Sequence, residues 1–399
     1  VPRKVWFSIP VFWAQGGGTW GSGQCENYVP TWLKSSAPDH LINNQKVPGM
    51  DYPSFRQAYR NLILALGQHI KNDLSIELKD HIAGFFIAGG YDNETQVSAP
   101  HCQVDASSEI SLTEFKEFQL ATVQAFHDGL PEFPAFLLQA AMNYPSIRRD
   151  LVNLMLTFNP KNIGLGFNGM GPDIPAFYTD LVPPSNSSAN NGPFDVMKEN
   201  IGKLAIKFEP AHSMANDYQQ MYWSWLLAIG AFKVMAIDTQ DDWICSSIDD
   251  NGICTAPASS NFSVFQSQGN FPLDFFNFIS RQLGRDAKGT ADFWLAFHTT
   301  EYPPQGNGFN GVICGDTSNS YCHGWEGNFE HFLKVKAGKF SIRCLVSGMD
   351  VCKDTSLPSK SIYSRHAGKM EDDRILIELE TEATRSQVLS GVVLRIAWL

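Results

Sequence analysis

Short apolar runs alternate with longer amphipathic segments along the first two thirds of the chain. Residues 82–88 are nearly uncharged and bounded by glycine, which is typical of a strand buried on both faces of a parallel sheet. Residues 54–70 carry apolar side chains at helical spacing and open with Ser54 and Gln57, which predict a capping box. Ser111 with Glu114 predicts the start of another helix. The same reading predicts strands at 5–9, 134–140, 163–167, 204–208 and 234–237, and helices near 111–129, 147–156, 194–201, 218–232 and 275–283. We therefore expect an α/β fold, with residues 5–9 as another buried strand.

The pattern changes near residue 288, where predicted helices give way to strands and loops. Further strands are expected at 339–346, 361–364, 375–379 and 392–398. The sequence thus predicts two domains: a (β/α) barrel at 1–287, and a β-sandwich at 288–399 whose last strand is cut by the end of the sequence.

Two predicted strands run directly into a glutamate. Asn93 and Glu94 follow the strand at 82–88, and Glu209 follows the strand at 204–208. In a (β/α) barrel the carboxyl ends of the strands surround the active site. Hydrolysis of a glycosidic bond with retention requires two carboxyl groups roughly 5–5.5 Å apart. Glu94 and Glu209 are therefore a candidate catalytic pair, and the alternative is that Glu94 is an ordinary loop carboxylate.

Polar and aromatic side chains follow the same predicted strand ends. Asn93 is suited to hydrogen-bond a sugar hydroxyl, whereas His212 could orient Glu209, contact sugar or be structural. Aromatic side chains on loops can stack on sugar rings or simply pack against their neighbours. The candidate substrate-binding residues are Asn93, Tyr91, Trp13, Trp32, Gln139, Asn168, His212 and Trp243.

Charge and composition exclude several classes of binding partner. The chain has 399 residues and a formal net charge of -11, which argues against a nucleic-acid surface. No apolar run approaches the roughly 20 residues of a membrane span. Histidines and cysteines lack metal-ligand spacing, so no metal or cofactor is expected. The sequence opens without a signal peptide, and we expect a mature chain or a fragment.

Eight cysteines and three N-glycosylation sequons indicate an extracellular protein. The sequons begin at Asn93, Asn186 and Asn261. Eight cysteines allow 105 pairings, and proximity along the chain favours three loop disulfides plus one long one. The favoured pairs are Cys245 with Cys254, Cys314 with Cys322, Cys344 with Cys352, and, by elimination, Cys25 with Cys102.

The Asn93–Glu94 pair after one strand and Glu209 three strands later resemble the acid/base and nucleophile of the retaining glycoside hydrolases of clan A. Segments 30–32, 51–53 and 64–67 are similar to the region between the third and fourth strands of beta-galactosidase-like and agarase-like members. The tail, with segments 363–365 and 393–398, resembles their C-terminal β-domains. If the strand at 82–88 is the fourth strand of such a barrel, residues 5–9 form the third strand. The TIM-type barrel then lacks its first two strands in this sequence.

The resemblance implies a secreted retaining glycosidase that cleaves a β-linked polysaccharide or oligosaccharide, with Glu94 as acid/base and Glu209 as nucleophile. An open barrel also exposes unpaired strand edges, which predicts self-assembly with another chain. The alternative is a non-catalytic extracellular structural or carbohydrate-binding glycoprotein that keeps the fold. A glycan on Asn93 would occlude the pocket and favour that alternative.

Overall fold

The computed structural model describes residues 4–10, 12–15, 24–87, 89–90, 95, 97–99, 104–138, 146–170, 193–210, 218–238, 247–248, 254–256, 271–285, 294–296, 329–331, 333–335, 341–342, 366–367 and 377–379. The chain divides into two compact units. Unit 1 comprises residues 1–168 and 185–207, and unit 2 comprises residues 169–184 and 208–399.

A six-stranded sheet contains the apolar runs expected from the sequence. Its strands follow one another in chain order: β1 (Val5–Ser8), β6 (Ile82–Phe86), β9 (Ala135–Leu138), β10 (Ile163–Met170), β11 (Ile206–Pro210) and β12 (Ala236–Ile237). The pairs β1–β6, β6–β9 and β9–β10 are parallel. The Leu165 N–H donates to Ala205 O at 2.9 Å, beside the start of β11. The predicted α/β fold with a parallel sheet is thus confirmed.

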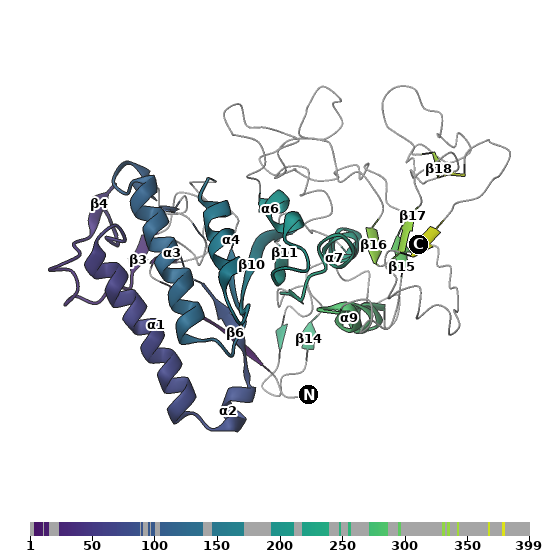
Figure 1. The fold of residues 1–399 in the computed structure, drawn as a ribbon, viewed down its shortest axis with the longest axis horizontal. Coiled ribbons are helices and arrows are strands. Elements are labelled where there is room, and N and C mark those ends of the chain that lie inside the picture. The colour runs from purple at the N-terminus through teal and green to yellow at the C-terminus, as the bar shows by residue number, and fades with distance from the viewer. Residues whose placement is uncertain are drawn as a thin grey trace. The chain divides into compact units, whose positions relative to one another are not determined.

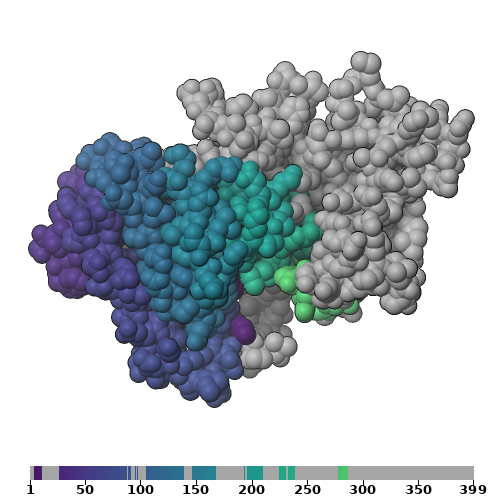
Figure 2. Space-filling view, in the orientation of Figure 1, coloured from purple at the N-terminus to yellow at the C-terminus, as the bar shows by residue number. Residues whose placement is uncertain are grey.

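Helices between the strands cover one face of this sheet. In unit 1 they are α1 (Pro53–Asp73), α2 (Ile76–Asp80), the 3-10 turn η2 (Ala106–Ser108), α3 (Leu112–Gly129), α4 (Ile147–Thr157) and α6 (Pro193–Glu199). Figure 1 shows α1, α3 and α4 side by side, and they form much of the surface seen in Figure 2. The Phe85 ring of β6 lies 6.5 Å from Phe126 and 5.8 Å from Phe133, between ring centroids. Phe85 thus points from the sheet toward α3.

One of the two predicted helix starts is confirmed. Ser111 and Glu114 form the capping box of α3, with Ser111 accepting from the Glu114 N–H. The capping box of Ser54 and Gln57 is wrong, because α1 begins at Pro53 and no side chain caps it. Proline suits the first helical turn, since its fixed φ is already helical. The Ser54 hydroxyl instead donates to Ser36 O at 2.6 Å.

The other face of the sheet is concave and filled by side chains. The Trp6 ring lies 5.7 Å from that of Phe86 and 5.6 Å from that of Phe136. Lys207 Nζ of β11 lies 5.8 Å from the Trp6 ring centroid. In a flat sheet, β1 and β11 would stand four strand spacings apart, roughly 19 Å. The sheet must therefore curl until its first and fifth strands share one interior layer.

Glycines make room for these rings. A Cβ at Gly84 would overlap the Trp6 ring, and a Cβ at Gly164 would lie 2.7 Å from the Phe136 ring. Both distances are too short for a real side chain, so the aromatic layer requires glycine opposite it.

β1 is less buried than expected. Val5 and Phe7 are 50% and 45% exposed, although residues 5–9 were predicted to be a buried strand. The reason is position, because β1 ends the strand order of the sheet and has β6 as its neighbour. Tyr59 of α1 is buried nearby and donates its hydroxyl to Ile9 O at 3.1 Å. Pairing of this edge with another chain remains a prediction.

Short antiparallel hairpins were missed in the sequence. Unit 1 contains β2 (Phe12–Gln15) with β3 (Gln24–Asn27), β4 (His40–Ile42) with β5 (Gln45–Val47), and β7 (Ser98–Ala99) with β8 (Val104–Asp105). Asn43 and Asn44 join β4 to β5 with φ of 49° and 63°. Two consecutive positive φ angles indicate a type I′ turn, for which asparagine is a recognised signal.

Unit 2 contains α7 (Tyr218–Phe232) and α9 (Phe271–Gln282). Trp225, Ile229 and Phe232 of α7 are buried. Its remaining strands pair antiparallel: β13 (Ser247–Ile248) with β14 (Cys254–Ala256), β15 (Trp294–Ala296) with β16 (Phe329–His331), β17 (Leu333–Val335) with β20 (Ile377–Leu379), and β18 (Ser341–Ile342) with β19 (His366–Ala367). The sandwich and its boundary at residue 288 remain predictions. No described helix is long and apolar enough to cross a membrane.

Candidate active site

Glu209 lies within β11, which begins two residues later than the sequence suggested. Its neighbour Phe208 is fully buried and packs edge-on against Phe232 of α7, at 5.1 Å between ring centroids. Alternate residues of a strand point to opposite faces. Glu209 therefore shares the face of Lys207, which is the concave one. It is partly exposed and stands near the carboxyl end of its strand.

The segment that carries the other candidate glutamate is anchored on both sides. Tyr91, Asn93 and Glu94 lie outside the described residues. Before them, Gly89 O accepts a hydrogen bond from Gln119 Nε2 of α3. After them, the Thr95 hydroxyl donates to Leu138 O, the last residue of β9, at 2.5 Å. Position 89 is thus fixed to α3, and position 95 is fixed to the end of β9.

The two side chains that hold this segment are both buried, so their hydrogen bonds contribute to the stability of the fold. Gln119 and Thr95 have no exposed surface. A Cβ at Gly89 would overlap the side-chain amide of Gln119, so a larger residue there would displace the amide that bonds Gly89 O. Because a buried donor without a partner is costly, each hydrogen bond specifies where the backbone passes.

Thr95 is also the threonine of the Asn93 sequon. Its hydroxyl has a folding role in the bond to Leu138 O. The triplet is therefore explained without a glycan, and glycosylation of Asn93 remains a prediction that the fold does not require.

Three of the other predicted substrate-binding residues lie in described strands or turns, and three lie outside the described residues. Asn168 lies in β10, beside β11, and Trp13 lies in β2. Trp32 is 70% exposed on the turn that precedes β4. Gln139, His212 and Trp243 lie outside the described residues.

The predicted disulfides and the other sequons fall largely outside the described part of the chain. Cys25 belongs to β3 and Cys254 to β14. Those outside the described residues are Cys102, Cys245, Cys314, Cys322, Cys344, Cys352, Asn186 and Asn261. Their pairing and modification remain predictions.

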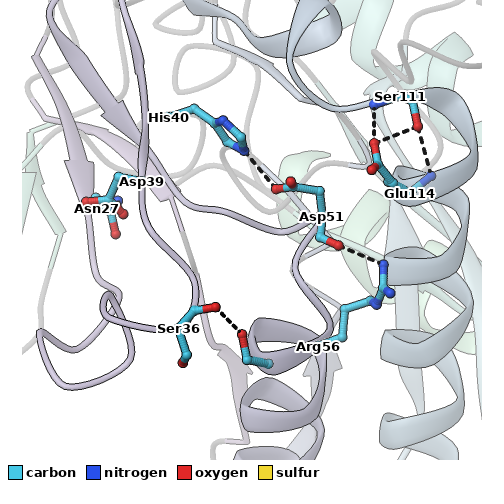
Figure 3. Close-up of polar contacts among 9 residues, drawn as sticks. Asn27, Ser36, Asp39, His40, Asp51, Arg56, Ser111 and Glu114 are labelled. Atoms are coloured by element: carbon cyan, nitrogen blue, oxygen red, sulfur yellow. Dashed lines mark hydrogen bonds and ion pairs between the residues drawn. The ribbon is translucent and has the colours of Figure 1, made fainter.

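A polar cluster joins the β4–β5 hairpin to the start of α1 (Figure 3). His40 Nε2 lies 2.8 Å from Asp51 Oδ1, and the His40 ring stacks on Tyr52 at 5.9 Å. Arg56 donates to Asp51 O at 3.0 Å, and its guanidinium pairs with Glu117 at 3.0 Å. Each of these contacts fastens one element of the fold to the next. We therefore assign the cluster a structural role.

Glu114 borders this cluster in Figure 3 and is held as a carboxylate. Hydrogen bonds from the Ser111 side chain and backbone lower the pKa of Glu114, and the charges of Arg56 and His40 act in the same direction. The lowered pKa belongs to the capping box of α3.

Lys207 is a functional candidate that sequence reasoning missed. It is fully buried, with Nζ 4.2 Å from the Phe86 ring centroid. The available signal was a charged residue inside the apolar run at 204–208, two positions before Glu209. Among the described residues, no group of three or more His, Cys, Asp or Glu could hold a metal ion.

Comparison with protein-family models gives no match, and no curated protein matches the sequence.

Proposed function

We propose that the chain is a retaining glycoside hydrolase of the clan A type, secreted, and acting on a β-linked polysaccharide or oligosaccharide. Glu209 is the nucleophile and Glu94 the acid/base. The observation that carries the proposal is the place of Glu209, partly exposed on the concave face near the carboxyl end of a strand in a parallel sheet. Catalytic side chains of (β/α) barrels occupy that kind of position.

The anchored segment after β6 supports the second role. Gln119 and Thr95 hold the backbone on either side of Glu94 to α3 and β9. Catalytic groups have to be fixed to within a fraction of an ångström, and buried hydrogen bonds to the flanking backbone provide such support. The proposal extends to the fold, in which the six-stranded sheet is part of a (β/α) barrel followed by a β-sandwich.

Turnover of aryl β-glycosides and β-linked polysaccharides by the purified chain is the first test, with ¹H NMR of the first-formed product. The product should keep the anomeric configuration of the substrate. Glu94→Gln and Glu209→Gln should each lower kcat by about 10²–10⁴-fold or more. Glu199→Gln is the matched control, because Glu199 is an exposed residue of α6.

Inversion of configuration, or full activity in both glutamine variants, would contradict the assigned roles. A folded chain that binds β-glycans without turnover would support the non-catalytic, carbohydrate-binding alternative.

A further inference from the structure

Two polar side chains of α3 lie inside the protein, one helical turn apart. Gln119 has no exposed surface, and Thr122 is 2% exposed. Within the described part of the chain, Gln119 Oε1 and Thr122 Oγ1 take part in no hydrogen bond. Gln119 Nε2, in contrast, donates to Gly89 O. One end of the Gln119 amide is therefore bonded to the protein, and the other end still requires a partner.

Aromatic rings flank Thr122 along its helix face. The residues one turn before and one turn after it are Phe118 and Phe126. The Phe118 ring lies 5.7 Å from that of Phe55 in α1, and the Phe126 ring lies 6.5 Å from that of Phe85 in β6, between centroids. Buried polar atoms are nearly always hydrogen-bonded, either to protein or to ordered water. In this apolar setting a water molecule is the partner that fits the Thr122 hydroxyl.

The spacing of the two residues suits a single bridging molecule. Residues i and i+3 of a helix lie on the same side, with Cβ atoms roughly 5–6 Å apart. Two hydrogen bonds of roughly 2.8 Å through one water oxygen span a similar distance. An amide oxygen accepts hydrogen bonds, and a hydroxyl oxygen also accepts them, so one water can donate to both atoms. Buried waters typically make 2–4 such bonds to polar groups that would otherwise lack partners.

We propose that Gln119 Oε1 and Thr122 Oγ1 form an internal water-binding site, in which one water donates an O–H to each oxygen atom. With Oε1 held in this way, the amide presents Nε2 to Gly89 O, so the water fixes the direction of the Gln119 amide. The site thereby supports Gly89, which precedes Glu94 by five positions. Only the support of a catalytic group rests on the proposed role of Glu94.

Thr122→Val distinguishes a bridged hydroxyl from a hydroxyl without a partner, because valine keeps the shape of threonine and lacks only the polar atom. Loss of the bridge leaves Gln119 Oε1 poorly bonded, and the unfolding equilibrium constant should rise about fivefold or more in chemical denaturation. Thr113→Val is the matched control, since Thr113 is exposed on the first turn of α3, and it should be close to neutral. A neutral or stabilising Thr122→Val would overturn the proposal.

A crystal structure tests the site directly. Electron density for a water within roughly 3 Å of both Gln119 Oε1 and Thr122 Oγ1 is expected in the wild-type chain, and it should be absent or displaced in Thr122→Val. A Thr122 hydroxyl that donates directly to Phe118 O, with no water between the two side chains, would overturn the proposal.

Neither measurement requires activity, so the two proposals fail separately. A bridging water in a chain that does not turn over glycosides leaves the water site standing and removes the glycosidase. Turnover that depends on Glu94, together with a neutral Thr122→Val and no bridging density, leaves the glycosidase standing and removes the water site.

Discussion

Lys207 Nζ lies 4.2 Å from the Phe86 ring centroid, although β9 and β10 separate their strands in the sheet. In a flat sheet those strands would be three spacings apart, roughly 14 Å. The contact is therefore possible because the sheet curves and brings β6 and β11 closer together on its concave face. The described rings of Trp6, Phe86 and Phe136 thus pack together with Lys207 in the concave layer.

Phe136→Ala should lower the free energy of unfolding by about 3–5 kcal/mol, because it removes a fully buried ring from this layer. Phe7→Ala is the matched control on the half-exposed edge strand and should cost much less. Chemical denaturation of both variants checks the expectation. Equal losses would contradict the burial difference between the two rings.

Gly67→Ala should destabilise the chain, although alanine normally stabilises a helix interior by about 1 kcal/mol relative to glycine. A Cβ at Gly67 of α1 would overlap the carbonyl of Gly129 of α3, so the two helices would have to separate. The expected cost is about 1–3 kcal/mol by thermal or chemical unfolding. Gln68→Ala, at an exposed position of the same helix, should be close to neutral. A more stable Gly67→Ala variant would show that the helices do not approach here.

Thr95→Val should cost about 1–3 kcal/mol of unfolding free energy, since it removes the hydroxyl that bonds Leu138 O inside the protein. Thr95→Ser keeps both the hydroxyl and the sequon and should cost less. Bacterially expressed protein, which carries no such glycan, isolates the hydrogen bond from glycosylation. Identical stability of the two variants would show that the Thr95 hydroxyl does not stabilise this segment.

The ion pair between α4 and α6 should contribute stability that depends on pH. Arg149 binds Glu199 through two contacts of 2.8 and 3.0 Å, and these bonds lower the pKa of Glu199. Because the folded-state pKa is the lower one, the contribution is complete above the unfolded-state pKa and disappears as pH falls through the folded-state pKa. The pair is half exposed, so its contribution should be about 0.2–1 kcal/mol. Glu199→Gln should flatten the acidic side of the stability curve, and Asp73→Asn, which removes a different exposed carboxylate, should leave this component in place.

Trp32→Ala should leave the melting temperature nearly unchanged, because the side chain is 70% exposed. If Trp32 is a stacking platform for sugar, retention on immobilised β-glycans should fall several-fold. Trp32→Tyr keeps an aromatic face and serves as the control. Unchanged retention in Trp32→Ala would exclude the residue from glycan binding.

Local patterns predicted the parallel sheet and its helices well. The alternation of residues 82–88 with amphipathic segments corresponds to β6, α3 and β9, and Ser111 with Glu114 predicted the start of α3. These signals lie within a few residues of one another. The exposure of Phe7 could not be predicted in the same way, because it depends on the place of β1 in the sheet order.

For the candidate site, too, local features could be predicted from the sequence and long-range contacts could not. Glu209 was predicted because a charged residue directly follows an apolar run. The partners of Lys207 depend on curvature that brings β11 opposite β1, and curvature is a property of the whole sheet. Gln119 and Gly89 are likewise 30 residues apart in sequence, and no local pattern relates them.

The buried hydroxyl of Thr95 would restrict when Asn93 could be glycosylated. The enzyme that glycosylates an N-x-T triplet must reach the threonine as well as the asparagine, and in the folded chain the Thr95 side chain is enclosed and bonded to Leu138 O. Modification of Asn93 therefore has to precede the closure of this loop onto β9. If Asn93 were glycosylated during synthesis, the site would be open for as long as residue 138, which lies 43 positions further along the chain, had not been made.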